Sequence, residues 1–459
     1  MKKLIFTLIA VVVIASCKNK QEPVNKTVIL KGTIVNYEED SLYMENITSK
    51  FTHLQEEIQS IVLNDNKEFS YQFELDSPAY FKIGRTFLYL SPGDSLVMGL
   101  DSGSRAKAFF SGKGAEANNY LRNVTYPKGG SFWNDVHQNE ALNIETYKDA
   151  PNVFKEVYSN RMVKFNALKN VSEEFKRLEK ARLKFDYVNS LNSIIYLYFK
   201  KIRLGELSHE EVMAKINGEI NDYFVPYKAE YLDDFNDTAY LQLEVYQSLL
   251  SDLSDEKFRN KNNLPKLNKE LQEYYTTSNL VYEIKYKGYS NELGEKLSKA
   301  VEEITNQNYV NVIQELLNEY KSITKGNPAS DLTFTTLNEG TVKLSDYKGK
   351  VIVLDLWATW CVPCIQEKPH FEALEKKYHG NDEVEFISLS IDTEKVWRNY
   401  YKKHEAIGNH FQINRSQLSS YKVMAIPRFF VIDKDFKIVD VFAPLPSTGE
   451  LETLINQYI

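Results

Sequence analysis

The pattern of apolar and polar positions divides the chain into three parts. Over residues 28–115, short apolar runs are separated by turn formers, and residues 69–75 alternate strictly between apolar and polar side chains. A period of two predicts half-buried strands, so this part is expected to form a small antiparallel β-sandwich or barrel. Over residues 116–325 the apolar positions recur at helical spacing with few prolines or glycines, which predicts an all-helical region.

The last part, residues 326–459, alternates between strand-like and helix-like segments. Its first buried strand is predicted at Val351–Trp357, an apolar run that reads as buried on both faces. Further strands are expected at residues 384–391, 429–432 and 437–442, with helices after Cys361, over 396–404 and over 451–455. The order strand, helix, strand, helix, hairpin, helix predicts an α/β domain of the thioredoxin-like class.

Composition limits the possible functions. The chain has 459 residues, which favours two or three domains, and a formal net charge of −7. No run of lysine and arginine is dense enough for a nucleic-acid surface, so a nucleic-acid partner is not expected. The chain contains three cysteines: Cys17, Cys361 and Cys364.

The pair Cys361 and Cys364 lies at the junction of the buried strand and a helix, which favours redox chemistry. Cys361 is expected at the helix N-terminus, where free N–H groups and the helix dipole stabilise a thiolate, so it is the predicted nucleophile. Cys364 is the predicted resolving thiol, and Pro363 is compatible with a first helical turn. Zinc would need further ligands and haem attachment would need a histidine at position 365, where Ile365 stands, so we expect neither metal nor cofactor.

A resolving thiol needs a group that accepts its proton, and two carboxylates are candidates. Asp355 lies within the apolar strand, where burial raises a carboxyl pKa towards neutrality. Glu367 lies three residues after Cys364. The competing interpretations are a structural polar residue at a strand end for Asp355 and an exposed helix residue for Glu367.

Residues 326–459 resemble the membrane-tethered thiol-disulfide oxidoreductases of the TlpA/ResA type. The matching stretches are Leu344–Lys350, Trp357–Cys364, Glu367–Pro369 and Ile426–Pro427. The resemblance implies a thioredoxin-like fold, a buried acid at Asp355 and an active-site glutamate at Glu367. It further implies a cis-proline at Pro427 that faces the dithiol.

The same resemblance implies a groove for the partner chain, to which Ile426 offers its backbone. Trp357 and Trp360 are expected to flank the dithiol as apolar walls. Arg428 stands where many thioredoxins carry a small hydroxyl residue, so this groove is expected to differ and to favour an acidic partner. A solvent-facing arginine is the alternative.

The N-terminus resembles a bacterial lipoprotein signal, with a basic start, an apolar core and small residues before Cys17. We therefore expect a signal peptide over residues 1–16, lipidation of Cys17 and a polar tether over 17–27. An ordinary secretory signal is the alternative. Lipidation would anchor the protein to a membrane of the cell envelope, facing the periplasm.

The predicted function is reduction of disulfides in envelope proteins, with an unidentified protein as electron donor. Cytochrome c maturation is one client class that the ResA resemblance implies. Through the turn Pro92–Asp94 and the rhythm of its strands, the segment 28–115 resembles a β-domain found ahead of thioredoxin-like modules in Bacteroidetes lipoproteins. The competing hypothesis is an envelope binding or scaffold lipoprotein in which residues 28–325 act and the dithiol is accessory.

Overall fold

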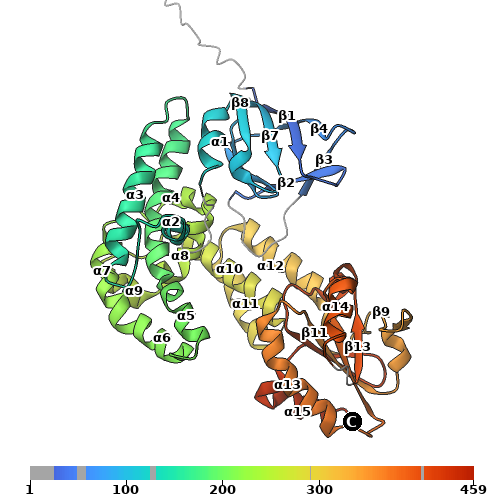
Figure 1. Ribbon diagram of the computed structural model, residues 1–459. Helices are drawn as coiled ribbons and strands as arrows, with labels where there is room; N and C mark the ends of the chain where they lie inside the picture. The colour runs from blue at the N-terminus through green and yellow to red at the C-terminus, as the bar shows by residue number, and fades with distance from the viewer. Residues whose placement is uncertain (1–24, 49–57, 125–130, 290, 405–407) are drawn as a thin grey trace, which may run out of the picture. The chain divides into compact units, whose positions relative to one another are not determined.

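The computed structural model describes residues 25–48, 58–124, 131–289, 291–404 and 408–459 (Figure 1). The expected Cys17 lipidation and signal peptide lie outside these residues. The chain forms two compact units, one made mainly of residues up to 249 and one made mainly of residues 250–459. No helix among the described residues is long and apolar enough to cross a membrane.

The first unit begins with two four-stranded sheets, ordered β4-β1-β7-β8 and β3-β2-β5-β6. The strands are β1 Thr27–Val35, β2 Ser41–Asn46, β3 Ile58–Val62, β4 Glu68–Glu74, β5 Ala79–Ile83, β6 Thr86–Leu90, β7 Ser95–Asp101 and β8 Phe109–Lys113. Their pairings are antiparallel, as expected, except that β1 and β7 run parallel. A parallel pair requires a long crossover connection, which the intervening strands β2–β6 supply.

Helices complete the first unit: α1 Ala115–Leu121, α2 Ser131–Gln138, α3 Ala150–Asn166, α4 Glu173–Asn192, α5 Phe199–Arg203, α6 His209–Lys215, α7 Asn221–Ala229 and α8 Glu244–Ser254, within which the two units divide. Two of these helices, α4 and α6, begin with a side-chain cap. The Ser172 side chain accepts a hydrogen bond from the Phe175 N–H, and Ser208 forms a capping box with Glu211.

The second unit contains a seven-stranded sheet, helices that precede it in the chain and helices that alternate with its strands. The helices before the sheet are α9 Glu256–Asn262, α10 Lys269–Lys287, α11 Asn291–Glu303 and α12 Gln307–Tyr320. The sheet has the order β10-β9-β13-β12-β11-β14-β15. Its strands are β9 Thr333–Thr335, β10 Thr341–Lys343, β11 Val351–Trp357, β12 Val384–Ser390, β13 Asn409–Gln412, β14 Arg428–Ile432 and β15 Ile438–Ala443. The helices that follow β11, β12 and β15 are α13 Val362–Lys377, α14 Glu394–Tyr401 and α15 Glu450–Ile455.

The central strand β11 is buried along its whole length, as its apolar run predicts. Alternate side chains enter two different cores. Val351 and Val353 pack with residues of α13 and α15, whereas Ile352, Leu354 and Leu356 share a core with residues of α10, α11 and α12. The sheet is therefore covered by helices on both faces, and the thioredoxin-like fold class is confirmed.

The division between the units differs from the expected boundary at residues 325 and 326. Helices α10, α11 and α12 belong to the predicted helical region, but they lie in the same compact unit as the sheet. The physical reason is the shared core: the apolar faces of these helices cover the sheet face that carries Leu354 and Phe430.

Candidate active site

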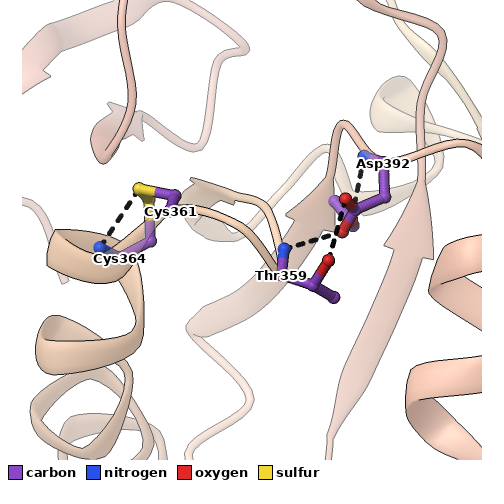
Figure 2. Close-up of a disulfide and its surroundings, with 5 residues drawn as sticks. Thr359, Cys361, Cys364 and Asp392 are labelled. Atoms are coloured by element: carbon purple, nitrogen blue, oxygen red, sulfur yellow. Dashed lines mark hydrogen bonds between the residues drawn. A yellow bond between two sulfur atoms is a disulfide. The ribbon is translucent and has the colours of Figure 1, made fainter. Parts of the chain in front are cut away.

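The two cysteines are joined by a disulfide at the start of α13, directly beyond the end of β11 (Figure 2). Their Cα atoms are 5.3 Å apart. Cys361 is the N-cap residue of α13, and its Sγ accepts a hydrogen bond from the Cys364 N–H at 3.2 Å. An N-terminal helix position directs unpaired N–H groups and the positive end of the dipole at this sulfur, which stabilises a thiolate there once the disulfide is reduced.

Asp392 holds the turn that carries Cys361. Its Oδ2 accepts the Thr359 N–H at 2.8 Å, and its Oδ1 accepts the Thr359 hydroxyl at 3.1 Å, as Figure 2 shows. The Ser390 hydroxyl donates to the same carboxylate at 3.0 Å. We did not predict Asp392 as a site residue. Its position two residues after the end of β12 was the available signal, because the parallel strands β11 and β12 end at the same edge of the sheet.

The loop before β14 lies against the dithiol. The peptide bond between Ile426 and Pro427 is cis. Ile426 packs against an apolar cluster formed by Trp357, Ala358 and the two cysteines. Trp360, which directly precedes Cys361, is 64% exposed, and Pro363, which lies between the two cysteines, is also exposed. We expect Trp360, Pro363 and Ile426 to line the partner groove.

Asp355 lies inside β11 and is 3% exposed. Its Oδ2 accepts one hydrogen bond, from the Ser388 hydroxyl at 3.5 Å. Burial raises the pKa of Asp355 to about 7, and the positive charge of Lys368 opposes this rise. A carboxyl group with this pKa can accept and return a proton near neutral pH.

Comparison with known proteins supports thiol-disulfide exchange as the chemistry of this domain. The Redoxin family matches residues 324–455. The thiol-disulfide oxidoreductase ResA of Bacillus thuringiensis subsp. konkukian is 31% identical over 138 residues, which are 29% of this chain and 77% of that protein. ResA of one Bacillus cereus strain is 36% identical over the same shares of both chains. The chain belongs to the ResA-like thiol-disulfide oxidoreductases.

A solved structure covers the same region. The crystal structure of a Bacteroides vulgatus protein assigned as a thiol-disulfide oxidoreductase is 45% identical over 30% of this chain and 99% of that chain, with a TM-score of 0.29. The ResA-like part of the present enzyme, defined by the Redoxin match, is its C-terminal third, which contains the disulfide.

Lys368 is a charged residue of this ResA-like site that sequence reasoning missed. Its side chain is 14% exposed, and its Nζ lies 4.4 Å from the centre of the Trp357 ring. The same Nζ lies 3.5 Å from the Tyr401 hydroxyl and 3.6 Å from Glu372 Oε1. A partly buried ammonium is tolerated here because an aromatic face, a hydroxyl and a carboxylate lie around it.

A half-buried carboxylate, that of Glu375, lies farther along α13. Burial raises the pKa of Glu375 to about 7, an effect that the charge of Glu372 increases and that of Lys368 decreases. The charge of Lys368 therefore lowers the pKa of both carboxyl groups, Asp355 and Glu375, against the effect of burial. Next to it, the Tyr401 hydroxyl lies 2.8 Å from Nδ1 of His410, a residue on β13.

Glu367, the second predicted acid, makes a contact that the sequence did not indicate. Its two carboxylate oxygens accept hydrogen bonds from the Ser447 N–H at 3.0 Å and the Ser447 hydroxyl at 2.8 Å. These bonds tie α13 to the 3-10 helix Pro446–Thr448 before α15. Glu367 is half-buried and already bonded, whereas Asp355 accepts a single long hydrogen bond among the residues that the structure describes.

Arg428 does not face the groove, so the prediction that it lines this groove is wrong, as is the alternative of a solvent-facing arginine. Its guanidinium carbon lies 3.2 Å from the centre of the Phe442 ring, and the residue is 7% exposed. Among the described residues, its Nε and Nη2 have no hydrogen-bond partner. Strand alternation is the reason: Arg428 lies on the face of β14 that also carries Phe430, which is covered by the core shared with α10–α12.

Replacing Arg428 with methionine is expected to leave the free energy of unfolding unchanged or to raise it by about 1–2 kcal/mol. Burial lowers the pKa of Arg428 to about 10, because the cation is desolvated without hydrogen bonds at Nε and Nη2. Methionine fills a similar volume without that cost. Urea denaturation at pH 7 measures the difference, and a loss of stability above about 2 kcal/mol would contradict this view of the site.

The acidic side chains around the dithiol do not form a cluster of metal ligands. Within the described part of the chain, no group of three or more His, Cys, Asp or Glu side chains is arranged to hold a metal ion.

Proposed function

We propose that this ResA-like enzyme reduces disulfides of proteins in the cell envelope through Cys361 and Cys364. One observation carries the proposal: the disulfide lies at the N-terminus of α13, next to the cis Ile426–Pro427 bond and beyond the strand that buries Asp355. This arrangement combines a stabilised thiolate, a partner groove and a proton acceptor.

The proposed reaction starts from the reduced enzyme. The Cys361 thiolate attacks one sulfur of the client disulfide, forming a mixed disulfide and releasing the other client sulfur as a thiolate. Cys364 then gives its proton to the Asp355 carboxylate and attacks Cys361 Sγ. The enzyme disulfide forms, the bond between Cys361 and the client breaks, and the second client thiolate leaves. The client gains two electrons, which an external dithiol or electron-donor protein returns to the enzyme.

We further propose that the protein is exported and anchored by a lipid on Cys17. The supporting feature is the N-terminal sequence, a basic start and apolar run that end at this cysteine. The first unit would then act as a spacer or docking module between the membrane and the redox site. Clients in cytochrome c maturation are one class that the similarity to ResA suggests.

Insulin reduction tests the proposed activity. The full chain is used with Cys17→Ala in every sample, so that Cys361 and Cys364 are its only cysteines. With dithiothreitol as the electron donor, this protein is expected to precipitate reduced insulin faster than dithiothreitol alone. The matched control carries Cys361→Ser and Cys364→Ser in the same background. Equal rates for the enzyme and this control would exclude the proposed function.

A further inference from the structure

A small cavity lies beside the disulfide, between the residue before Cys361 and the residue before the cis-proline. Its volume is about 230 Å³. The lining residues are Trp360, Ile391, Arg415, Leu418, Val423, Met424, Ala425 and Ile426. They come from the active-site turn, the end of β12, the 3-10 helix Arg415–Tyr421 and the loop that leads to Pro427.

The cavity is suited to one apolar side chain. Seven of its eight lining residues are apolar, and two of them, Trp360 and Met424, are 64% and 39% exposed. An apolar cavity of about 150 Å³ is large enough for benzene, so this one can hold a leucine- or phenylalanine-sized group. Covering exposed apolar surface with such a group removes it from water, which favours binding.

Arg415 gives the cavity a positive edge. It is the one charged residue among those that line the cavity, and it is exposed. Its Nη2 donates to the Met424 carbonyl at 3.4 Å, and no carboxylate within the described part of the chain forms an ion pair with it. A guanidinium has five N–H donors in a planar fork, so most of them stay available for a carboxylate.

We propose that the enzyme prefers client segments that carry an apolar residue and an acidic residue close to the target cysteine. The apolar side chain would occupy the cavity, and the carboxylate would pair with Arg415. The sequence suggested that Arg428 gives the groove a preference for acidic partners, and we now assign this preference to Arg415. This inference rests on the proposed function, because it takes the cysteine of the client to react at Cys361, next to Trp360.

Chain geometry limits how far the apolar residue of the client can lie from its reacting cysteine. A client segment that lies extended in the groove advances about 3.3 Å per residue. Trp360 immediately precedes Cys361, and Ile426 packs against the cluster that contains both cysteines. The cavity is therefore within reach of side chains one or two residues from the reacting cysteine of the client.

Four short peptides test the proposal. Each contains one cysteine, linked by a disulfide to the chromogenic thiol 5-thio-2-nitrobenzoate, with leucine or serine before the cysteine and glutamate or lysine after it. The reduced full chain with Cys17→Ala, freed of excess reductant, is mixed with each peptide, and the release of the coloured thiol is followed.

The leucine peptides are expected to react about tenfold faster than the serine peptides at limiting concentration, because a side chain of this size is removed from water. Glutamate is expected to be favoured over lysine by about threefold at low salt, the range of an exposed ion pair, and the preference should vanish at high salt. Arg415→Gln should abolish the charge preference and keep the leucine preference. Ala425→Trp, which fills the cavity, should abolish the leucine preference.

Lys395→Gln is the matched control, since it removes one exposed positive charge that does not line the cavity. Equal rates for all four peptides, or a charge preference that survives Arg415→Gln, would overturn the inference while leaving disulfide exchange intact. If none of the peptides reacts but denaturants show the protein folded, the proposed function itself fails.

Discussion

Asparagine in place of Asp355 is expected to slow the release of the client from the mixed disulfide by about 10²- to 10⁴-fold, the usual contribution of a positioned general base. The carboxylate form is the proton acceptor, and burial places its pKa at about 7. In the unmodified enzyme, release should therefore slow as the pH falls through about 7, because Asp355 becomes protonated. The variant should show no such step.

The measurement is the decay of the mixed disulfide, followed by acid quenching and mass spectrometry between pH 5 and 9. Glu367→Gln is the comparison, since Glu367 was the other predicted acid and its carboxylate is held by Ser447. If Glu367→Gln removes the pH dependence and Asp355→Asn retains it, Glu367 is the proton acceptor and the role assigned to Asp355 is wrong.

Asp355→Asn is also expected to change the free energy of unfolding, in a direction that depends on pH. The pKa of Asp355 is about 7 in the folded protein and about 3.9 in an unfolded chain. Between these values the folded state binds more protons, so the contribution of Asp355 to the free energy of unfolding is present below about pH 4 and is lost as the pH rises to 7. Asp355→Asn should therefore be more stable than the unmodified protein at pH 8, on the order of a few kcal/mol. At pH 4 the two should be nearly equal.

The position of the cysteine pair between a strand and a helix could be predicted from sequence because its signals are local. An apolar run long enough for one buried strand is followed directly by two cysteines and a helical pattern, and the structure places β11, Cys361 and α13 in this order. The acid within that run could be found for the same reason: a carboxylate between apolar neighbours is buried whatever covers the sheet.

Other features could not be predicted, because they depend on contacts between segments that are distant in the sequence. Strand β13 was not predicted, because Asn409–Gln412 is short and has no alternating pattern; it is defined by its pairing with β12. Lys368 is one of many lysines in the sequence, and its burial follows only from the positions of Trp357 and Tyr401. The helical pattern of α10–α12 showed that each helix has an apolar face, but not that this face covers the thioredoxin-like sheet.

The direction of Arg428 illustrates the same limit. Its place after Pro427 suggested a groove residue, yet the side to which a strand residue points depends on register and on which face is covered. In the structure this side is occupied by Phe442 and the core shared with α12. The positive charge beside the groove comes instead from Arg415, which lies close to the cis-proline only in the folded chain.

Trapping of the mixed disulfide tests the central claim most directly. Without the Cys364 thiol, the bond between Cys361 and a client cannot be displaced from within the enzyme, so Cys364→Ser should accumulate a covalent adduct. The reduced Cys17→Ala, Cys364→Ser protein is mixed with insulin and analysed by non-reducing mass spectrometry. We predict an adduct of one insulin molecule that dithiothreitol releases, and no adduct with Cys361→Ser in the same background, because Cys364 is 2% exposed and lacks the N-cap position. An adduct with Cys361→Ser and none with Cys364→Ser would contradict the assignment of Cys361 as the attacking thiol, and the absence of adducts with both would contradict thiol-disulfide exchange at this site.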